Sequence, residues 1–390
     1  MLAIQAKTIY TVTKGTIKDG TILIKDGKIQ DVLDRVDIPA GYSVIDASLS
    51  RVSPGFIDAH THLGAHIDGA GDAGNDANEM TDPITPHLHI MDSINPYDKS
   101  FREVLESGVT TVMIMPGSAN LFGGMCAALK THGKGLYDML FIKDAGIKMA
   151  MGENPKRVYG VSMSKPPYTR MGEAGLIREI FTKTGNYLKK KASAKGKNEE
   201  FLETDLKFEA ITRLLSGEVP ARFHAHSAND LLTAIRLSEE YGFRISLEHC
   251  TEGPRIAEEI ARRSIPVTLS PLMGARNKVE TAERSFKTPA ILYKEGVKFA
   301  ISTDGTSTVQ WLAINAGLAV REGLPEEEAL KSITITPAEI IGAKDRLGSI
   351  EPGKDADLVL FSGHPLENLR VVEMVIVNGE IVHNRGLKVG

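Results

Sequence analysis

Short apolar runs alternate with amphipathic helical stretches along the middle of the chain, from Pro54 onward. This alternation is typical of βα units, which build parallel sheets covered by helices. Clear helical stretches lie at 229–242 and 254–264. The predicted strands lie at 55–60, 109–116, 145–152, 221–226, 244–250, 266–271 and 298–305. The pattern therefore predicts an α/β fold, a (β/α)8 TIM barrel.

Both ends of the chain carry β-type patterns instead. Residues 25–28 and the Asn378-Gly379 pair have the composition of tight hairpin turns. Domains are often inserted into another domain whose two parts come from the two chain ends. We therefore expect the ends to pair into a small β-sandwich, with the barrel inserted between them. The predicted domains are residues 1–52 plus 346–390 for the sandwich and residues 53–345 for the barrel.

Composition and charge exclude several classes of protein. A net charge of −4 over 390 residues gives no basic surface for nucleic acid. No run of about 18 apolar residues indicates a membrane span, and the amino terminus lacks a secretory pattern. Two cysteines make no disulfide framework. We expect a cytoplasmic protein that binds a small-molecule substrate, and a homo-oligomer is possible. We interpret the lysine-rich stretch 189–197 as a mobile surface connection.

His60 and His62 come at the end of the apolar strand predicted at 55–60. Side chains two apart on a strand point to the same face. In a barrel that face is the interior, and active sites lie at the carboxyl ends of the strands. The pair can therefore share one divalent cation at the barrel rim.

Three other predicted strands also end in residues that can bind a metal: His224, His249 and Asp304. His226 points the same way as His224, and we expect it to bind substrate or to orient a ligand. Each histidine can also be a hydrogen-bonded rim residue, and Asp304 a helix N-cap. Their shared rim favours a site for Zn²⁺ or a similar cation that activates water. Asp304 is the candidate catalytic residue, a general base and then a general acid toward the leaving nitrogen.

The segments PGFIDAHTH, FHAH, EHC, STDG and GSIEPGKDADLVLF together resemble the amidohydrolase superfamily over nearly the whole chain. Within it, the chain looks closest to imidazolonepropionase-like proteins and metal-dependent dipeptidases. The resemblance implies a barrel with a β-sandwich, one or two divalent metals and hydrolysis at a carbon–nitrogen bond. By motif, it implies five ligands: His60, His62, His224, His249 and Asp304.

The resemblance also implies a role for Lys148, because many two-metal members carry a bridging carboxylated lysine on the fourth barrel strand. Lys148 lies within an apolar strand, which is unusual for an unpaired ammonium. We therefore expect N6-carboxylysine at Lys148 and two Zn²⁺ ions, with Fe, Mn or Co as alternatives. Glu153 is an alternative bridging residue, and an ammonium that snorkels to the rim is an alternative role for Lys148.

Tyr159 and Arg170 are candidate substrate-binding residues in the long connection after the Lys148 strand. Arg170 can hold a substrate carboxylate through a two-pronged contact. The segment 117–125 is rich in small residues, so its backbone can approach a ligand closely. An ordinary loop role is an alternative for each of them.

Together these features predict a metal-dependent hydrolase that cleaves an amide or peptide-like bond with a metal-activated hydroxide, such as a dipeptidase or N-acyl amino acid hydrolase. The alternative is a mononuclear deaminase or cyclic-amide hydrolase of the imidazolonepropionase type, which has no use for a bridging Lys148. A barrel without catalysis is a third interpretation, disfavoured because all five motif positions are filled. The fold does not name the substrate.

Overall fold

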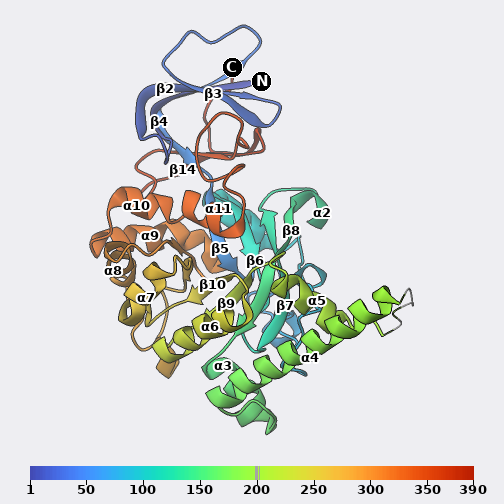
Figure 1. The fold of residues 1–390 in the computed structure, drawn as a ribbon. Coiled ribbons are helices and arrows are strands. Elements are labelled where there is room, and N and C mark those ends of the chain that lie inside the picture. Colours follow the sequence, from blue (N-terminus) through green and yellow to red (C-terminus); the bar gives the residue numbers. More distant parts are fainter. Residues whose placement is uncertain (198–200, 202) are drawn as a thin grey trace.

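The structure is a computed structural model that describes residues 1–197, 201 and 203–390. It holds an eight-stranded sheet and a seven-stranded sheet, one below the other in Figure 1. The eight-stranded sheet follows chain order from β5 to β12. Its strands are β5 Phe56–Thr61, β6 Val109–Ile114, β7 Phe122–Lys130, β8 Leu140–Ala150, β9 Ala221–Ala225, β10 Ile245–His249, β11 Val267–Leu269 and β12 Phe299–Ile301.

The ends of β5 and β12 come together and nearly close the sheet into a barrel. The backbone N–H of Asp304 donates to His60 O at 3.1 Å, and that of His62 donates to Gly305 O at 2.9 Å. The predicted TIM-barrel class with a second sheet from both chain ends is therefore confirmed, and so are the predicted strands.

One strand of the barrel was missed. β7 pairs antiparallel with both β6 and β8, so the barrel sheet is not wholly parallel. Part of it falls in the small-residue segment 117–125. All nine of its residues are buried, so its sequence lacks the alternation that marks a half-buried strand. With β7 counted, β8 and its Lys148 come fourth in the barrel.

The helices pack around the barrel (Figure 1). The helices predicted at 229–242 and 254–264 are present as α6 and as η4 followed by α7. None of the helices in the described residues is long and apolar enough to cross a membrane. The α-helices of six or more residues are α1 Lys99–Glu106, α4 Arg170–Gly196, α5 Leu206–Leu215, α6 Ala228–Tyr241, α7 Ala257–Arg262, α8 Thr288–Lys294, α9 Leu312–Arg321, α10 Glu326–Lys331 and α11 Ile335–Ile341. The π-helix η3 spans Lys156–Ser162, and η4 spans Gly253–Ile256.

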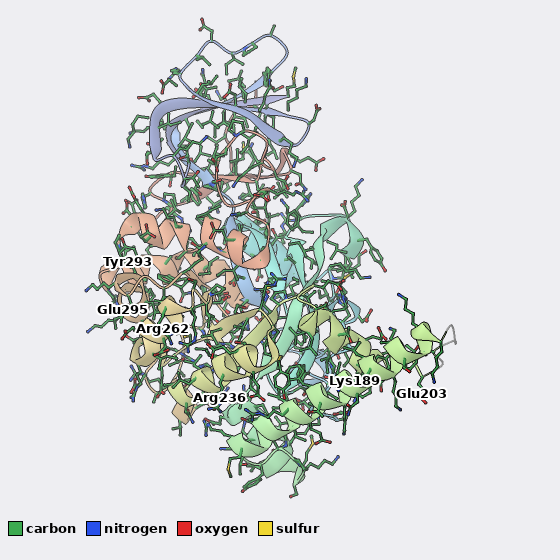
Figure 2. The ribbon with its side chains drawn as sticks, viewed as in Figure 1. Lys189, Glu203, Arg236, Arg262, Tyr293 and Glu295 are labelled. Carbon is green, nitrogen blue, oxygen red and sulfur yellow. The ribbon has the colours of Figure 1, made fainter. Side chains whose placement is uncertain are left out.

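The lysine-rich stretch 189–197, interpreted from sequence as a mobile surface connection, is helical up to Gly196. Residues 189–196 form the last turns of α4, whose end projects from the barrel at Lys189 in Figure 2. Lysine and alanine are good helix formers, which explains helix where charge alone suggested a loop. Lys191 also pairs with Glu209 of α5 at 2.5 Å. Arg170, expected in a loop, is the first residue of this helix.

The second sheet draws strands from both chain ends, with β4 parallel to β1 and antiparallel to β13. Its hairpin turns at Asp26-Gly27 and Asn378-Gly379 have positive φ at both positions, as the type I′ turn requires. Only Gly55 separates β4 from β5 of the barrel. The strand order is β15 Glu380–Asn384, β14 Val372–Val377, β13 Leu358–Phe361, β4 Ser43–Pro54, β1 Leu2–Tyr10, β2 Thr16–Lys25 and β3 Lys28–Asp34.

Candidate metal centre

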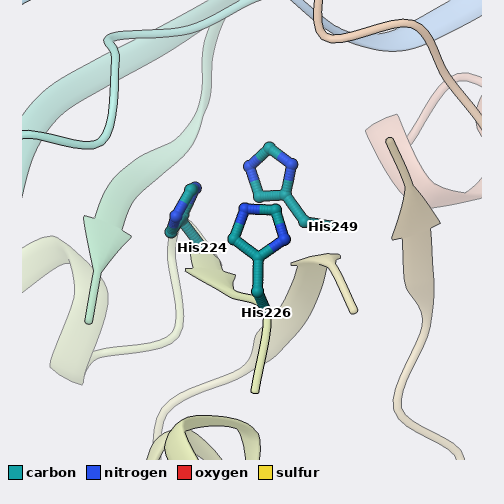
Figure 3. A group of neighbouring side chains, drawn as sticks. All are labelled: His224, His226 and His249. Carbon is teal, nitrogen blue, oxygen red and sulfur yellow. The ribbon is translucent and has the colours of Figure 1, made fainter. Parts of the chain in front are cut away.

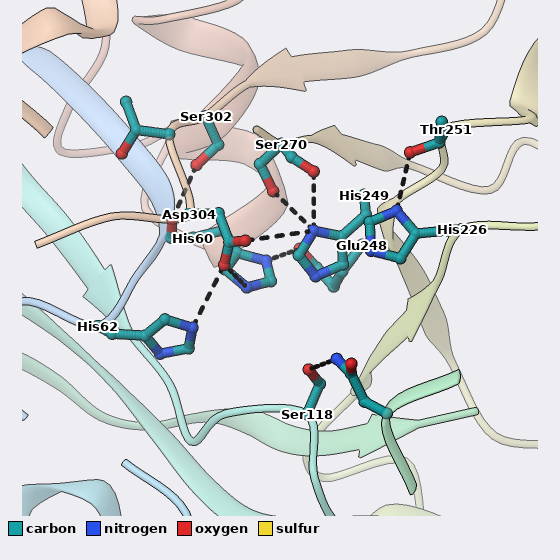
Figure 4. Close-up of polar contacts among 12 residues, drawn as sticks. His60, His62, Ser118, His226, Glu248, His249, Thr251, Ser270, Ser302 and Asp304 are labelled. Carbon is teal, nitrogen blue, oxygen red and sulfur yellow. Dashed lines mark hydrogen bonds and ion pairs between the residues drawn. The ribbon is translucent and has the colours of Figure 1, made fainter. Parts of the chain in front are cut away.

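The carboxyl ends of β5 and β12 bring His60, His62 and Asp304 together. Asp304 Oδ1 lies 3.4 Å from His60 Nε2 and 3.3 Å from His62 Nε2. Figure 4 shows this carboxylate between the imidazoles. Asp304 has a left-handed backbone conformation (φ +57°), a strain that is concentrated at functional sites.

The ends of β9 and β10 supply a second group, made of His224, His226 and His249. Figure 3 shows the three rings gathered in one place. The ring centroid of His249 lies 4.1 Å from that of His224 and 4.7 Å from that of His226. It also lies 4.6 Å from the ring of His60, which joins the two groups into one centre.

Hydrogen bonds fix the orientation of these rings. When a ring Nδ1–H donates to a carbonyl or carboxylate, its Nε2 keeps a lone pair that can bind a metal. Three rings of the centre have such a partner at Nδ1. The pairs are His60 with Glu248 Oε2 at 2.9 Å, His62 with Met115 O at 2.8 Å and His249 with Ser270 O at 2.8 Å.

Several buried nitrogens of the centre have no partner in the described residues. They are both ring nitrogens of His224 and the Nε2 of His249. Buried polar atoms are costly unless something satisfies them. A divalent cation held by these nitrogens and the Asp304 carboxylate would do so, and imidazole with carboxylate is a donor set that Zn²⁺ and similar metals accept. The residues therefore fit a metal.

The charge states also fit, because metal binding requires neutral imidazoles and ionised carboxylates. Burial lowers the pKa of His60 to about 4 and that of His224 well below its usual value. For Asp304, burial opposes ionisation, but the contacts with the neighbouring His62 and His60 outweigh it. The pKa of Asp304 is therefore lowered.

Lys148 extends from β8 into the same centre. Its side chain is 0% exposed, so its ammonium does not snorkel to solvent. Its Nζ lies 3.0 Å from His60 Nε2 and 3.0 Å from Met115 Sδ. Burial lowers the pKa of Lys148, against the charges of Glu248 and Asp304, which favours a neutral amine. Glu153, the alternative bridging residue, begins the short helix α3 (Glu153–Pro155) and belongs to neither ligand group.

A cavity of about 370 Å³ opens above the centre. His226 and Asp304 line it, together with Ser118 of the small-residue segment. A larger cavity, of about 880 Å³, lies at the opposite ends of β9–β12 and contains none of the candidate ligands. The carboxyl ends of barrel strands are where active sites form, so the smaller cavity is the candidate site.

Tyr159 and Arg170 are not brought to this cavity. Tyr159 is buried, and its hydroxyl donates to Asn120 Oδ1 at 2.6 Å. Arg170 donates from Nε and Nη2 to both oxygens of Asp230, at 2.8 and 3.0 Å. Each side chain already has partners elsewhere, so the substrate-binding roles predicted for them gain no support.

Two buried carboxylates that support the centre were missed, although both lie inside the sequence motifs. Asp58 accepts from His60 N at 3.1 Å and from Thr303 N at 3.1 Å, and so ties β5 to the end of β12. Glu248 accepts from His60 and from Ser246 Oγ at 2.6 Å. An acidic residue inside an otherwise apolar strand was the available signal for both.

Comparison with known proteins agrees with this architecture. The profile of the Amidohydrolase family matches residues 51–382. The chain is 31% identical over 377 residues to Amidohydrolase tasK from Hapsidospora irregularis, an alignment that covers 89% of this chain and 38% of that protein. The chain thus spans well under half of that relative. It is 26% identical to the imidazolonepropionase of Thermoplasma acidophilum, covering 94% of this chain and 90% of that protein.

A solved structure extends the likeness to three dimensions. The crystal structure of an amidohydrolase from Thermotoga maritima superposes with a TM-score of 0.96 and is 43% identical in sequence. The match covers 99% of this chain and 100% of that one. Both the barrel and the sheet from the chain ends are therefore shared.

Proposed function

Because this chain belongs to the amidohydrolase family, whose members hydrolyse carbon–nitrogen bonds, we propose that it is a two-metal hydrolase of an amide or peptide-like bond. The observation that carries the proposal is a convergence at one barrel rim: imidazole nitrogens without partners in the described residues, the Asp304 carboxylate and a buried Lys148. A dipeptide or an N-acyl amino acid is the substrate class we propose.

The ligands divide between two positions. His60, His62 and Asp304 would hold one cation, and His224 and His249 the other, with His226 beside them. Lys148 would contribute to both as a carbamate, formed when its neutral amine adds to the carbon of CO2 and releases a proton. The low pKa that burial gives to Lys148 favours this addition.

A bound divalent cation supplies Lewis acidity, which lowers the pKa of water and polarises a carbonyl group. Asp304, ionised at neutral pH, accepts the proton of the attacking water and delivers it to the departing nitrogen. His226 holds its ring in the cavity wall through Nδ1 and Thr251 Oγ1, 2.8 Å apart, and orients the substrate. Asp58 ties β5 to the end of β12, and Glu248 of β10 holds the His60 ring in place.

Metal analysis of the purified protein, together with ¹³C NMR after exposure to ¹³CO2, tests the two-metal arrangement. We expect two metal ions per chain and a carbamate resonance that is lost in Lys148→Ala. Assay against a library of dipeptides and N-acyl amino acids tests the activity. One metal per chain with a free Lys148 amine would contradict the two-metal proposal.

Replacing Asp304 by Asn separates proton transfer from folding. Because the amide cannot accept a proton, we expect turnover to fall by a factor on the order of 100 to 10,000 while most of the metal stays bound. Asp345→Asn makes the same change at an exposed position and should keep full activity. Activity that survives Asp304→Asn would show that another group moves the proton.

The alternative function is a one-metal deaminase or cyclic-amide hydrolase. The similarity to an imidazolonepropionase over 94% of this chain favours it. Cyclic amides and amino-substituted heterocycles therefore belong in the same library. Turnover of these compounds by a protein with one metal, unchanged by Lys148→Met, would support this alternative.

A further inference from the structure

The cavity above the candidate metal centre carries positive charge on one wall. Lys278 and Arg284 both line it, from the segment between β11 and α8. Among the described residues that line this cavity, Asp304 is the only one with a carboxylate, and Asp304 is a candidate metal ligand. The wall therefore attracts an anionic group of whatever molecule enters.

Arg284 is held in place without being neutralised. Its Nη1 donates to Ala275 O at 2.8 Å. Its Nε is buried and has no hydrogen-bond partner in the described part of the chain. Burial lowers the pKa of this guanidinium, and the charge of Asp304 opposes that effect. A buried donor without a partner is unfavourable, so a ligand that supplies an acceptor is favoured.

The segment around Arg284 is shaped to leave room for the guanidinium. Gly274 has a positive φ of +141°, and a side chain there would place its Cβ 3.0 Å from Arg284 Nη1. Lys278 is less available than Arg284, because its Nζ donates to Asn154 Oδ1 at 2.6 Å and lies 3.8 Å from Glu280 Oε1. Arg284 is therefore the more available of the two cations on this wall.

We propose that Arg284 holds a carboxylate of the substrate through its guanidinium N–H donors, with Lys278 adding positive charge. This inference rests on the proposed function, because it adds a carboxylate group to the description of the substrate that this site would cleave. Two parallel N–H donors match the two oxygens of a carboxylate. A cavity of about 370 Å³ suits a small ligand. The substrate is then an amide with its scissile bond over Asp304 and a carboxylate at the Arg284 wall.

Matched substrates test this specificity in the metal-loaded enzyme. N-acetyl amino acids are compared with the corresponding N-acetylalkylamines, which lack only the carboxylate. We expect wild type to prefer the carboxylates by about 100-fold in kcat/KM. Arg284→Gln should remove that preference chiefly by raising KM for the carboxylates. Lys287→Gln, which removes a charge from an exposed position of the same segment, should behave as wild type.

Binding measured without turnover tests the proposal independently. Metal-loaded Asp304→Asn protein is titrated calorimetrically with N-acetyl-L-alanine and with N-acetylethylamine. We expect the carboxylate to bind at least about tenfold more weakly when Arg284→Gln is added, and the neutral amide to bind equally well to both proteins.

The outcomes separate this proposal from the proposed function. Equal hydrolysis of both substrate series, with carboxylate binding indifferent to Arg284, would overturn the carboxylate proposal and leave the hydrolase standing. If a metal-loaded enzyme hydrolyses none of the library, the proposed function fails, and the calorimetric titration still decides whether Arg284 binds a carboxylate.

Discussion

At the scale of single residues, Glu173 is a carboxyl group whose burial favours the protonated form. Its side chain is fully buried on α4; Oε2 accepts from Gly152 N at 3.0 Å, and Oε1 has no partner in the described residues. Burial, with a further contribution from the charge of Asp230, raises the pKa of Glu173 to about 8. Ionising this group inside the protein is therefore unfavourable.

This raised pKa predicts how stability depends on pH. Between the ordinary value of 4.5 and about 8, folded Glu173 keeps a proton that the unfolded chain has released. Stability therefore falls as pH rises through this window, by an amount on the order of a few kcal/mol. Glu173→Gln should flatten that decline and make the protein more stable than wild type at pH 9.

Urea unfolding at a series of pH values between 5 and 9 measures this effect. Glu258→Gln makes the same chemical change at an exposed position and should keep the wild-type slope. A Glu173→Gln variant with the wild-type pH dependence would mean that the buried carboxyl ionises without cost.

The candidate ligands could be predicted from sequence because strand ends fix them. His60, His62 and Asp304 each follow an apolar run, and parallel strands end at a common rim. Glu248 and Arg284 could not be found in this way. Glu248 immediately precedes His249, and the left-handed backbone of His249 (φ +74°) breaks the strict alternation of faces at that point. Arg284 lies on an irregular segment, whose path over the cavity depends on tertiary packing.

At the scale of elements, α4 contains a glycine that costs stability without serving the structure. Gly185 lies inside this helix, and a Cβ there would meet nothing within 4 Å. Alanine loses less conformational freedom on folding than glycine does. We expect Gly185→Ala to raise the free energy of unfolding by about 0.5–1 kcal/mol, as measured by urea denaturation.

Gly242 provides a control with the same free space and a different backbone. A Cβ at this position would also meet nothing within 4 Å, but Gly242 ends α6 in the left-handed conformation with φ +71°. Gly242→Ala should therefore destabilise the protein by about 1 kcal/mol. Equal effects of the two substitutions would show that free space, and not backbone conformation, decides the outcome.

Helical periodicity in the sequence located elements of the structure more reliably than strand patterns did. α6 appears where the sequence predicts a helix, because its apolar stripe faces the barrel and its polar side faces water. β7 is buried along its whole length, so no alternation separates it from a loop of small residues. The lysines near the end of α4 were assigned to a loop because they are charged. Charge alone does not distinguish an exposed helix from a loop.

At the scale of the whole molecule, a buried ion network joins the barrel to the second sheet. Lys130 of β7 contacts Asp357 and lies 3.3 Å from Asp355 Oδ2, and each of the three side chains is at most 5% exposed. Asp355 also pairs with Lys28 of the second sheet and with Arg346. The meeting of the chain ends could be predicted from their β patterns, but this network could not, because its members lie far apart in sequence.

Removing Lys130 tests whether the barrel and the second sheet unfold as one unit. Lys130→Met leaves two buried carboxylates without their shared ammonium, so we expect the free energy of unfolding to fall by about 3–5 kcal/mol. Lys143→Met removes an exposed lysine from neighbouring β8 and should change stability by less than about 0.5 kcal/mol. Adding Asp357→Asn to Lys130→Met should recover part of the loss, because one unpaired charge disappears with it.

The two bodies can be followed separately during this unfolding. The one tryptophan, Trp311, ends η6 (Ser307–Trp311) beside α9 of the barrel, and hydrogen exchange reports on β1–β4 of the second sheet. Since β4 continues into β5 after one residue, we expect both probes to give the same midpoint in wild type. Lys130→Met should move both midpoints together. If the midpoints separate only in the variant, the ion network is what couples the second sheet to the barrel. If they already separate in wild type, the second sheet and the barrel unfold independently.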